Sequence, residues 1–118
     1  MTQSAHLSSI HSLHQLPNQK DLFLVGNRSP FIYVISVRGN VVSTLQTDNE
    51  LTALSTSARG EYIYASDSQS RISCLNFKST KVVARIKATD ADILALVHHP
   101  FANIIAVLSD DGLVNLWH

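Results

Sequence analysis

The sequence predicts an all-β fold of short antiparallel strands, and three features of the chain support this. Apolar runs of strand length alternate with short polar turns from Leu22 to the end of the chain. The pair Asp111-Gly112 separates two of these runs, and Asp-Gly between apolar runs is a strong hairpin signal. Pro100 and Gly112 limit the apolar runs near the carboxyl end to strand length, which argues against helices there.

A repeat of about 40 residues runs along the chain. Trp117 superposes on Leu75 at an offset of 42 residues (117 − 75), and Leu75 superposes on Ile35 at 40 residues (75 − 35). This period, with four short runs per unit, is that of a WD-type propeller blade. The sequence therefore predicts a partial WD-repeat β-propeller of about three four-stranded antiparallel blades, the last one lacking its fourth strand. The predicted blades are approximately residues 9–46, 50–87 and 91–118.

The first blade is predicted from four runs joined by turn residues. Its first run, Ser9–Leu16, is rich in Ser, His and Gln and is a poor strand by composition. Leu22–Gly26 and Phe31–Val37 are strongly β-forming, and Pro30 between them cannot donate to a ladder, which favours a turn. A Gly-Asn turn then leads into the fourth strand, Val41–Leu45.

The second blade follows the same plan. Its expected strands are Thr52–Ser57, Tyr62–Ser66, Arg71–Asn76 and Lys81–Ile86. In the third blade, runs beginning at Ile93 and Ile104 are apolar at nearly every position, which suits strands covered on both faces. Leu113–Trp117 is its third strand, and in closed propellers the missing fourth strand can come from the other end of the chain. Because an open arc of blades would expose large apolar faces, we expect a longer protein, or assembly with copies of itself or with other blades.

Composition and charge narrow the classes of function. Lys+Arg and Asp+Glu number 9 each, so net charge gives no reason to expect nucleic acid or an anionic membrane as a direct partner. The single cysteine, Cys74, excludes a disulfide within the chain. No apolar run reaches the length of a transmembrane helix, and Met1–Gln15 has no signal-peptide core. These features predict a soluble intracellular protein.

Several motifs stand in a fixed order between Leu22 and His118. They are Asn27-Arg28-Ser29, Arg59-Gly60-Glu61-Tyr62-Ile63-Tyr64, His98-His99-Pro100, Asn103-Ile104-Ile105-Ala106, Asp110-Asp111-Gly112-Leu113 and Leu116-Trp117. In this order and spacing the chain resembles the carboxy-terminal blades of the WD-repeat spliceosomal proteins of the Smu type, the RED-binding splicing factors. The helical amino-terminal region and most blades of that family are absent, and Thr80 and Thr89 replace a glycine and a histidine of the family.

The resemblance implies a nuclear, non-enzymatic scaffold without a cofactor that supports pre-mRNA splicing through protein partners such as RED. In many WD repeats, a Trp, a strand Ser or Thr, a turn Asp and an inter-blade His form a hydrogen-bond relay. Trp117, Ser109 and Asp111 match three of its members. Such a relay is physically reasonable, because a buried indole N–H needs an acceptor. We therefore expect these residues to form a structural site.

Surface loops are the remaining candidates for function. The inter-blade crossovers and the turns between second and third strands share one face of a propeller, and loops on rigid scaffolds often carry binding function. The residues predicted on this protein-binding face are Asn27, Arg28, Asp48, Asp67, Gln69, Asp90 and Asp92. For any single one of them, an ordinary solvated turn residue is the simpler interpretation.

Enzymatic and metal chemistry find little support in the sequence. His11 and His14 would meet only on a helix, and the adjacent His98 and His99 would point to opposite faces of a strand. Cys74 lies within an apolar strand, where a thiol is usually inert, and no glycine-rich phosphate loop is present. Two other hypotheses remain open. One is a WD-repeat adaptor of another pathway, such as a ubiquitin-ligase substrate receptor, and the other is a hydrolase or metalloprotein that uses the histidines.

Overall fold

The described residues form three antiparallel sheets of four, four and three strands. The structure is a computed structural model that describes residues 10–17, 21–47, 49–57, 59–87, 91–99 and 104–117. Within each sheet, every strand pairs with its neighbours in sequence. The predicted fold class, a partial propeller whose last blade has three strands, is therefore confirmed.

The sheets follow one another along the chain. The first contains β1 (Ile10–Gln15), β2 (Leu22–Asn27), β3 (Phe31–Ser36) and β4 (Val41–Gln46). The second contains β5 (Leu51–Thr56), β6 (Tyr62–Asp67), β7 (Arg71–Asn76) and β8 (Val82–Lys87). The third contains β9 (Ile93–His98), β10 (Ile105–Ser109) and β11 (Val114–Trp117). In the text below these are blades 1, 2 and 3.

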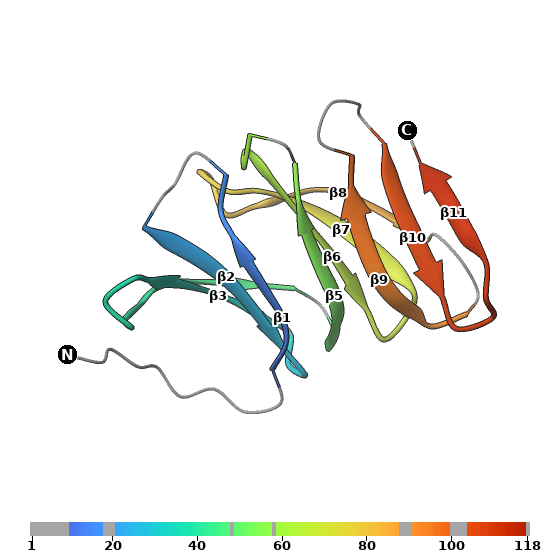
Figure 1. Ribbon diagram of the computed structural model, residues 1–118, viewed down its shortest axis with the longest axis horizontal. Coiled ribbons are helices and arrows are strands. Elements are labelled where there is room, and N and C mark those ends of the chain that lie inside the picture. The colour runs from blue at the N-terminus through green and yellow to red at the C-terminus, as the bar shows by residue number, and fades with distance from the viewer. Residues whose placement is uncertain are drawn as a thin grey trace.

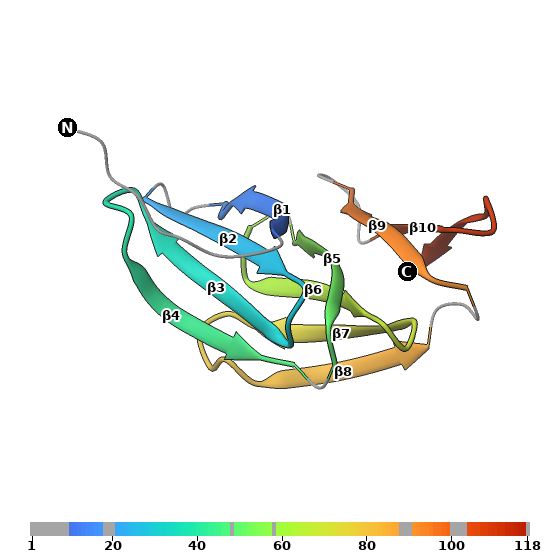
Figure 2. The same ribbon diagram turned by 90° about the horizontal axis from the view of Figure 1, so that it is seen from below.

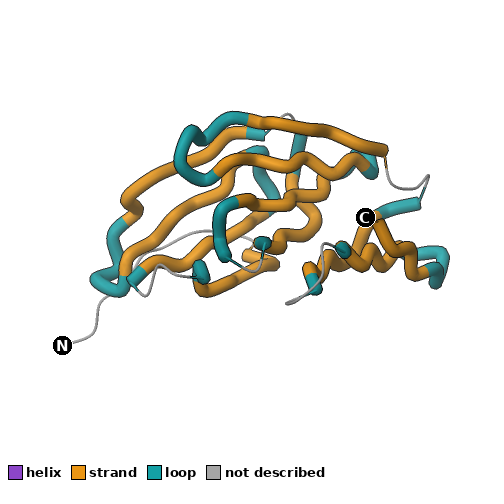
Figure 3. The backbone as a smooth tube through the Cα atoms, turned by 90° about the horizontal axis from the view of Figure 1, so that it is seen from above, coloured by secondary structure: helices purple, strands orange, loops and turns teal. Residues whose placement is uncertain are grey.

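The blades stand side by side, with their first strands next to one another (Figure 1). β5 contacts both β1 and β9, so the first strands form the inner side of the arc. Figure 2 shows β4 and β8 on the side away from these first strands. The described chain consists of strands and loops throughout (Figure 3).

Two clusters of buried side chains hold the blades together. The first lies between blades 1 and 2 and consists of Leu16, Leu24, Ile32, Val34, Leu45, Leu51, Leu54, Ile63, Ala65 and Leu75. The second lies between blades 2 and 3 and consists of Ala53, Ile72, Ile93, Leu96 and Val107. Ala53 and Leu54 are adjacent, and they serve different clusters because successive strand side chains point to opposite faces. The blade faces are thus the core of the fold.

In blade 2, burial falls from the first two strands to the fourth. Four of the six residues of β5 are buried, whereas five of the six residues of β8 are exposed. The pattern follows from position, because the first strand is covered by neighbouring blades and the fourth strand borders solvent on its outer edge. Val83 and Ile86 are accordingly exposed although they are apolar.

Several turn residues have positive backbone φ angles. Gly60, in the turn from β5 to β6, has φ of +73°, and a Cβ atom there would lie 2.5 Å from the backbone oxygen of Pro17. Gly112, in the turn from β10 to β11, has φ of +84° with open space around it. Thr80 has φ of +60°, a conformation that favours glycine, and it stands where the resembled family has glycine.

Candidate protein-interaction face

The turns between second and third strands lie beside the crossovers, on one face of the arc. The Leu51 amide donates to the Ser29 carbonyl (3.1 Å), which joins blade 1 to the start of blade 2. The Ser70 hydroxyl donates to the Ala91 carbonyl (2.6 Å), which joins blade 2 to the crossover into blade 3. We refer to residues 27–30, 47, 49–51, 67–70, 91–93 and 110–113 as the interaction face.

A pocket of about 460 Å³ opens on this face. The residues that line it are Arg28, Glu50, Leu51, Thr52, Ser68, Asp92, Ile93 and Leu94. Leu51 and Ile93 are buried and belong to the two core clusters, whereas Arg28, Glu50 and Asp92 are exposed. The pocket therefore has a fixed apolar base and a charged rim.

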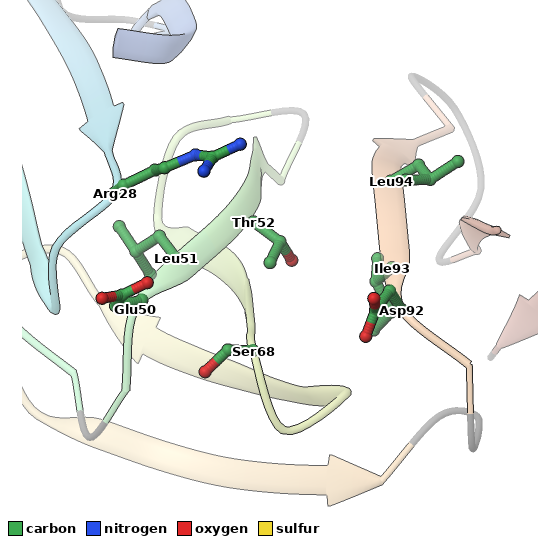
Figure 4. A pocket seen from close by; sticks show the side chains of 8 residues that line it. All are labelled: Arg28, Glu50, Leu51, Thr52, Ser68, Asp92, Ile93 and Leu94. Atoms are coloured by element: carbon green, nitrogen blue, oxygen red, sulfur yellow. The ribbon is translucent and has the colours of Figure 1, made fainter. Parts of the chain in front are cut away.

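The charged rim comes from different parts of the chain. Figure 4 shows Arg28 and Asp92 on opposite sides of the pocket, with Thr52 and Ser68 between them. The carboxylates of Glu50 and Asp92 give the rim two negative charges against the single positive charge of Arg28. Such a rim can form ion pairs with both signs of charge on a bound polypeptide, with a preference for basic side chains.

The predicted face residues divide into exposed and buried ones. Arg28, Gln69 and Asp92 are exposed, and Arg28 and Asp92 line the pocket. Asn27 and Asp67 are only 6% and 4% exposed, so the prediction that they present a binding surface needs correction. Asp48 and Asp90 lie outside the described residues.

Hydrogen bonds within the fold explain why these two side chains are buried. One oxygen of Asp67 accepts from the amides of Gln69 (2.9 Å) and Arg71 (3.1 Å), and the other accepts from the Asn49 side chain (3.3 Å). The Asn27 side-chain oxygen accepts a bond from the Ser29 hydroxyl. Both side chains thus fold back to shape their own turns, as Asn and Asp do when they satisfy nearby backbone groups.

Six lining residues escaped the sequence prediction, namely Glu50, Leu51, Thr52, Ser68, Ile93 and Leu94. Glu50 could have been predicted on this face, because it is charged and ends the crossover between the first two predicted blades. Leu94 could not have been predicted, because the sequence does not show which side of the sheet an apolar residue in an apolar run faces. Ser68 lies in a turn that the repeat places on this face. Its position in the repeat, and not its residue type, could therefore have predicted it.

The structure does not bring the three predicted relay residues together. Trp117 pairs with Ile105, four residues before Ser109 on β10, which is about 13 Å along the strand. The Ser109 hydroxyl instead donates to the Leu113 carbonyl (3.3 Å), and Asp111 accepts from the Leu113 amide (3.1 Å). Ser109 and Asp111 thus stabilise the turn from β10 to β11, and the relay is corrected to a turn motif. Thr89 lies outside the described residues.

The indole N–H of Trp117 is buried and has no hydrogen-bond partner in the described part of the chain. Trp117→Phe is therefore expected to change the free energy of unfolding by less than about 1.5 kcal/mol, because the ring contacts remain and no bond is lost. A Trp117 relay would instead predict a loss of up to about 3 kcal/mol. Urea unfolding followed by circular dichroism distinguishes a relay from its absence. A loss of unfolding free energy of about 3 kcal/mol would show that the indole N–H has a hydrogen-bond partner in solution.

His14, His98 and Cys74 pack within the fold. The His98 ring stacks on Tyr64 at a centroid distance of 5.5 Å, and the His98 amide donates to the Ser55 hydroxyl (3.1 Å). Burial lowers the pKa of His14, and a hydrogen bond with the Leu54 backbone partly opposes this effect. Burial raises the pKa of the Cys74 thiol, which disfavours the reactive thiolate. Within the described ranges, no group of three or more His, Cys, Asp or Glu side chains could hold a metal ion.

Comparison with known proteins agrees with this fold. WD40 repeat-containing protein smu1 of Dictyostelium discoideum is 29% identical over 112 residues, which are 92% of this chain and 21% of that protein. No family model matches the chain. This relative confirms the resemblance to the Smu type, and the chain spans about a fifth of its length.

Solved structures show the same architecture. The Cps50 (Swd1) β-propeller domain of Myceliophteria thermophila matches with a TM-score of 0.75 and 16% identity, covering 98% of this chain and 36% of that one. A chain of the mitotic checkpoint complex matches with a TM-score of 0.83 and 19% identity, covering 92% of this chain and 36% of that one. In the described residues no helix has the length and hydropathy to cross a membrane. The chain is a partial WD40-type β-propeller of three blades, similar in sequence to a Smu-type WD-repeat protein.

Proposed function

We propose that this chain is part of a non-enzymatic scaffold that supports pre-mRNA splicing by holding protein partners on the interaction face. The fold carries the general part of the proposal, because WD40 propellers typically serve as platforms for other proteins and present their loops on a rigid framework. The resemblance to the Smu type carries the splicing part, and with it a nuclear location and RED among the partners. Since the chain spans 21% of its relative, the partners of the whole protein belong to this proposal.

The observation that best supports a binding role is the pocket around Arg28, Glu50 and Asp92. Its three charged side chains come from two crossovers and one turn, which ties the rim to the geometry of all three blades. The base consists of core residues, so the rim is held on a rigid support. Charged groups held in fixed positions favour selective partners, because a mismatch of charge across an interface costs several kcal/mol.

Affinity capture from nuclear extract tests the proposal. The tagged chain is expected to recover spliceosomal proteins, with RED examined first. The double variant Arg28→Glu, Asp92→Arg inverts both sides of the rim and is expected to reduce recovery about tenfold or more through like-charge contacts. Lys78→Glu provides the matched control, because Lys78 is exposed in the turn from β7 to β8 and does not line this pocket.

The possible results separate the parts of the proposal. Recovery of spliceosomal proteins that is lost only with the double variant supports both the function and the face. An equal loss of recovered spliceosomal proteins with Lys78→Glu would show that the pocket is not the binding site. Recovery of ubiquitin-ligase subunits without splicing proteins would favour the adaptor of another pathway, and circular dichroism of each variant verifies that the fold is retained.

A further inference from the structure

The positive charge of the chain is concentrated in one hairpin. Residues 71–87, which form β7, the turn after it and β8, contain five of the nine Lys and Arg residues and no Asp or Glu. The rest of the chain carries the other four basic residues and all nine acidic ones. The net charge of zero therefore results from a strongly positive hairpin within a chain that is otherwise acidic.

Strand register gathers three of these charges on one face of blade 2. Arg71 lies directly opposite Lys87, and Arg85 lies opposite Ser73, the next residue of β7 on the same face. The three cationic side chains are exposed. Residues directly opposite each other have Cβ atoms about 5 Å apart, and alternate residues of a strand are about 7 Å apart. We refer to Arg71, Arg85 and Lys87 as the basic face.

The opposed pair Arg71 and Lys87 is unfavourable for the sheet, because like charges directly across an antiparallel pair destabilise it. Further along the same face the pairing is apolar. Leu75 lies opposite Val82, and both pack in the cluster between blades 1 and 2. The apolar end thus anchors the hairpin, and the cations at the other end are held on fixed strands where an anion can bridge them.

The acidic residue beside the basic face is turned inward. Asp67 ends β6 next to Arg71 and is 4% exposed. Its oxygens accept hydrogen bonds from the amides of Gln69 and Arg71 and from the Asn49 side chain. Its carboxylate is therefore committed to the turn, and the outer surface of β7 and β8 remains cationic.

The basic face borders the outer strand of the middle blade. Figure 2 shows β8 on the side of blade 2 away from the first strands. Five of the six residues of β8 are exposed, and they include the apolar Val83 (56%) and Ile86 (39%). A polypeptide that lies along β8 would therefore meet cationic and apolar side chains together.

The chemistry of the hairpin favours a polypeptide over a nucleic acid. Surfaces that bind single strands combine basic residues with exposed aromatic rings on which bases stack. Phe77 is the only aromatic residue of the hairpin, and it packs against the core cluster between blades 1 and 2. The forked guanidinium groups of Arg71 and Arg85 suit carboxylates, which they can bind through two hydrogen bonds.

A second copy of the chain is a poor occupant of this surface. Antiparallel pairing of β8 with β8 of another copy would bring the cations of both strands together, and charged edge strands protect proteins against such pairing. The exposed acidic residues that the structure describes are dispersed over several loops, namely Asp21, Glu50, Glu61, Asp92, Asp110 and Asp111. They do not form an extended acidic segment.

We propose that the basic face and the exposed edge of β8 form a docking surface for an extended acidic segment of a partner polypeptide. Alternate side chains of an extended segment point the same way at a spacing of about 7 Å, which matches Arg85 and Lys87. Carboxylates at alternate positions would therefore pair with the basic face, and the remaining side chains would contact Val83 and Ile86. The surface is separate from the interaction face and does not depend on the proposed function.

Fluorescence anisotropy with the full chain tests the proposal. The probe is a labelled decapeptide of alternating Glu and Thr, and it is expected to bind saturably at low ionic strength. The same peptide with Gln in place of Glu should bind at least about tenfold more weakly, because it lacks the charges. Binding of the Glu peptide should also weaken as salt is added, since the screening length falls from about 10 Å at 0.1 M to about 3 Å at 1 M.

Variants locate the binding surface. Arg71→Gln combined with Lys87→Gln removes two of the three charges and is expected to weaken binding of the Glu peptide about five- to tenfold. Arg71→Lys keeps the charge and should stay within about threefold of the original affinity. Arg38→Gln is the matched control, because Arg38 is exposed in the turn from β3 to β4 of blade 1. It is expected to change the affinity by no more than about twofold.

Each outcome either supports or overturns the proposal. Binding that requires Glu in the peptide and is weakened by the double variant, but not by Arg38→Gln, supports the docking surface. Equal weakening by Arg38→Gln would show that net charge alone attracts the peptide. Tighter binding of a uridine decanucleotide would overturn the assignment to a polypeptide, and light scattering that shows a dimer displaced by the Glu peptide would identify a second copy as the occupant. Absence of saturable binding would leave the basic edge with only its protective role.

Discussion

Leu54→Ala is expected to lower the free energy of unfolding by about 2–5 kcal/mol, the range for leucine truncated in a packed core. Leu54 is 1% exposed and lies on β5, where four of the six residues are buried. Its side chain belongs to the cluster between blades 1 and 2, so alanine would leave a cavity where two sheets meet. Urea unfolding followed by circular dichroism measures the loss.

Val42→Ala is the matched control for this prediction. Val42 is 54% exposed on β4, and its truncation should change the free energy of unfolding by no more than about 0.5 kcal/mol. Similar small losses for both variants would mean that blades 1 and 2 do not pack through this cluster in solution.

Gly60→Ala is expected to lower the free energy of unfolding by about 3 kcal/mol or more, because two penalties add. The first is the left-handed backbone, with φ of +73°, which costs an L-residue about 1–2 kcal/mol. The second is a clash, because the new Cβ would lie 2.5 Å from the Pro17 backbone oxygen. A backbone atom cannot rotate away as a flexible side chain would, so the turn from β5 to β6 must move away from blade 1.

Gly112→Ala separates the two penalties. Gly112 has a similar φ of +84°, but nothing lies within 4 Å of the position that a Cβ would occupy. This variant should therefore show only the conformational cost of about 1–2 kcal/mol. Thermal unfolding of both variants provides the comparison, and equal losses would rule out close packing of Gly60 on Pro17.

The strands were largely predictable because this fold repeats a local pattern. Turn residues and apolar runs placed β2 and β3 to within one residue at each end, and the 42-residue offset aligned blade 3 with blade 2. β1 was harder, because Ser, His and Gln make Ile10–Gln15 a poor strand by composition. Its pairing with β2 and its contact with β5 outweigh that weak propensity.

The site was less predictable, because side-chain direction depends on register and on local hydrogen bonds. The WD-repeat pattern suggested that Ser109 and Trp117 meet, yet Ser109 lies at the turn of the β10–β11 hairpin and Trp117 pairs with Ile105 at the other end. Residue type gave no way to tell that Asp67 turns inward while Asp92 stays exposed. The pocket on the interaction face depends on how neighbouring blades pack, and the positions of strands in the sequence do not predict that packing.

The pairing of each strand with its neighbour in sequence has a consequence for the order of folding. Each blade can form as a series of hairpins, whose short loops carry a small closure entropy. The contacts between blades add only when two finished faces meet, as in repeat proteins whose stability is a sum of units and interfaces. A folding nucleus would therefore be expected in blade 2, the only described blade with a core cluster on both sides, and blades 1 and 3 would be added to it.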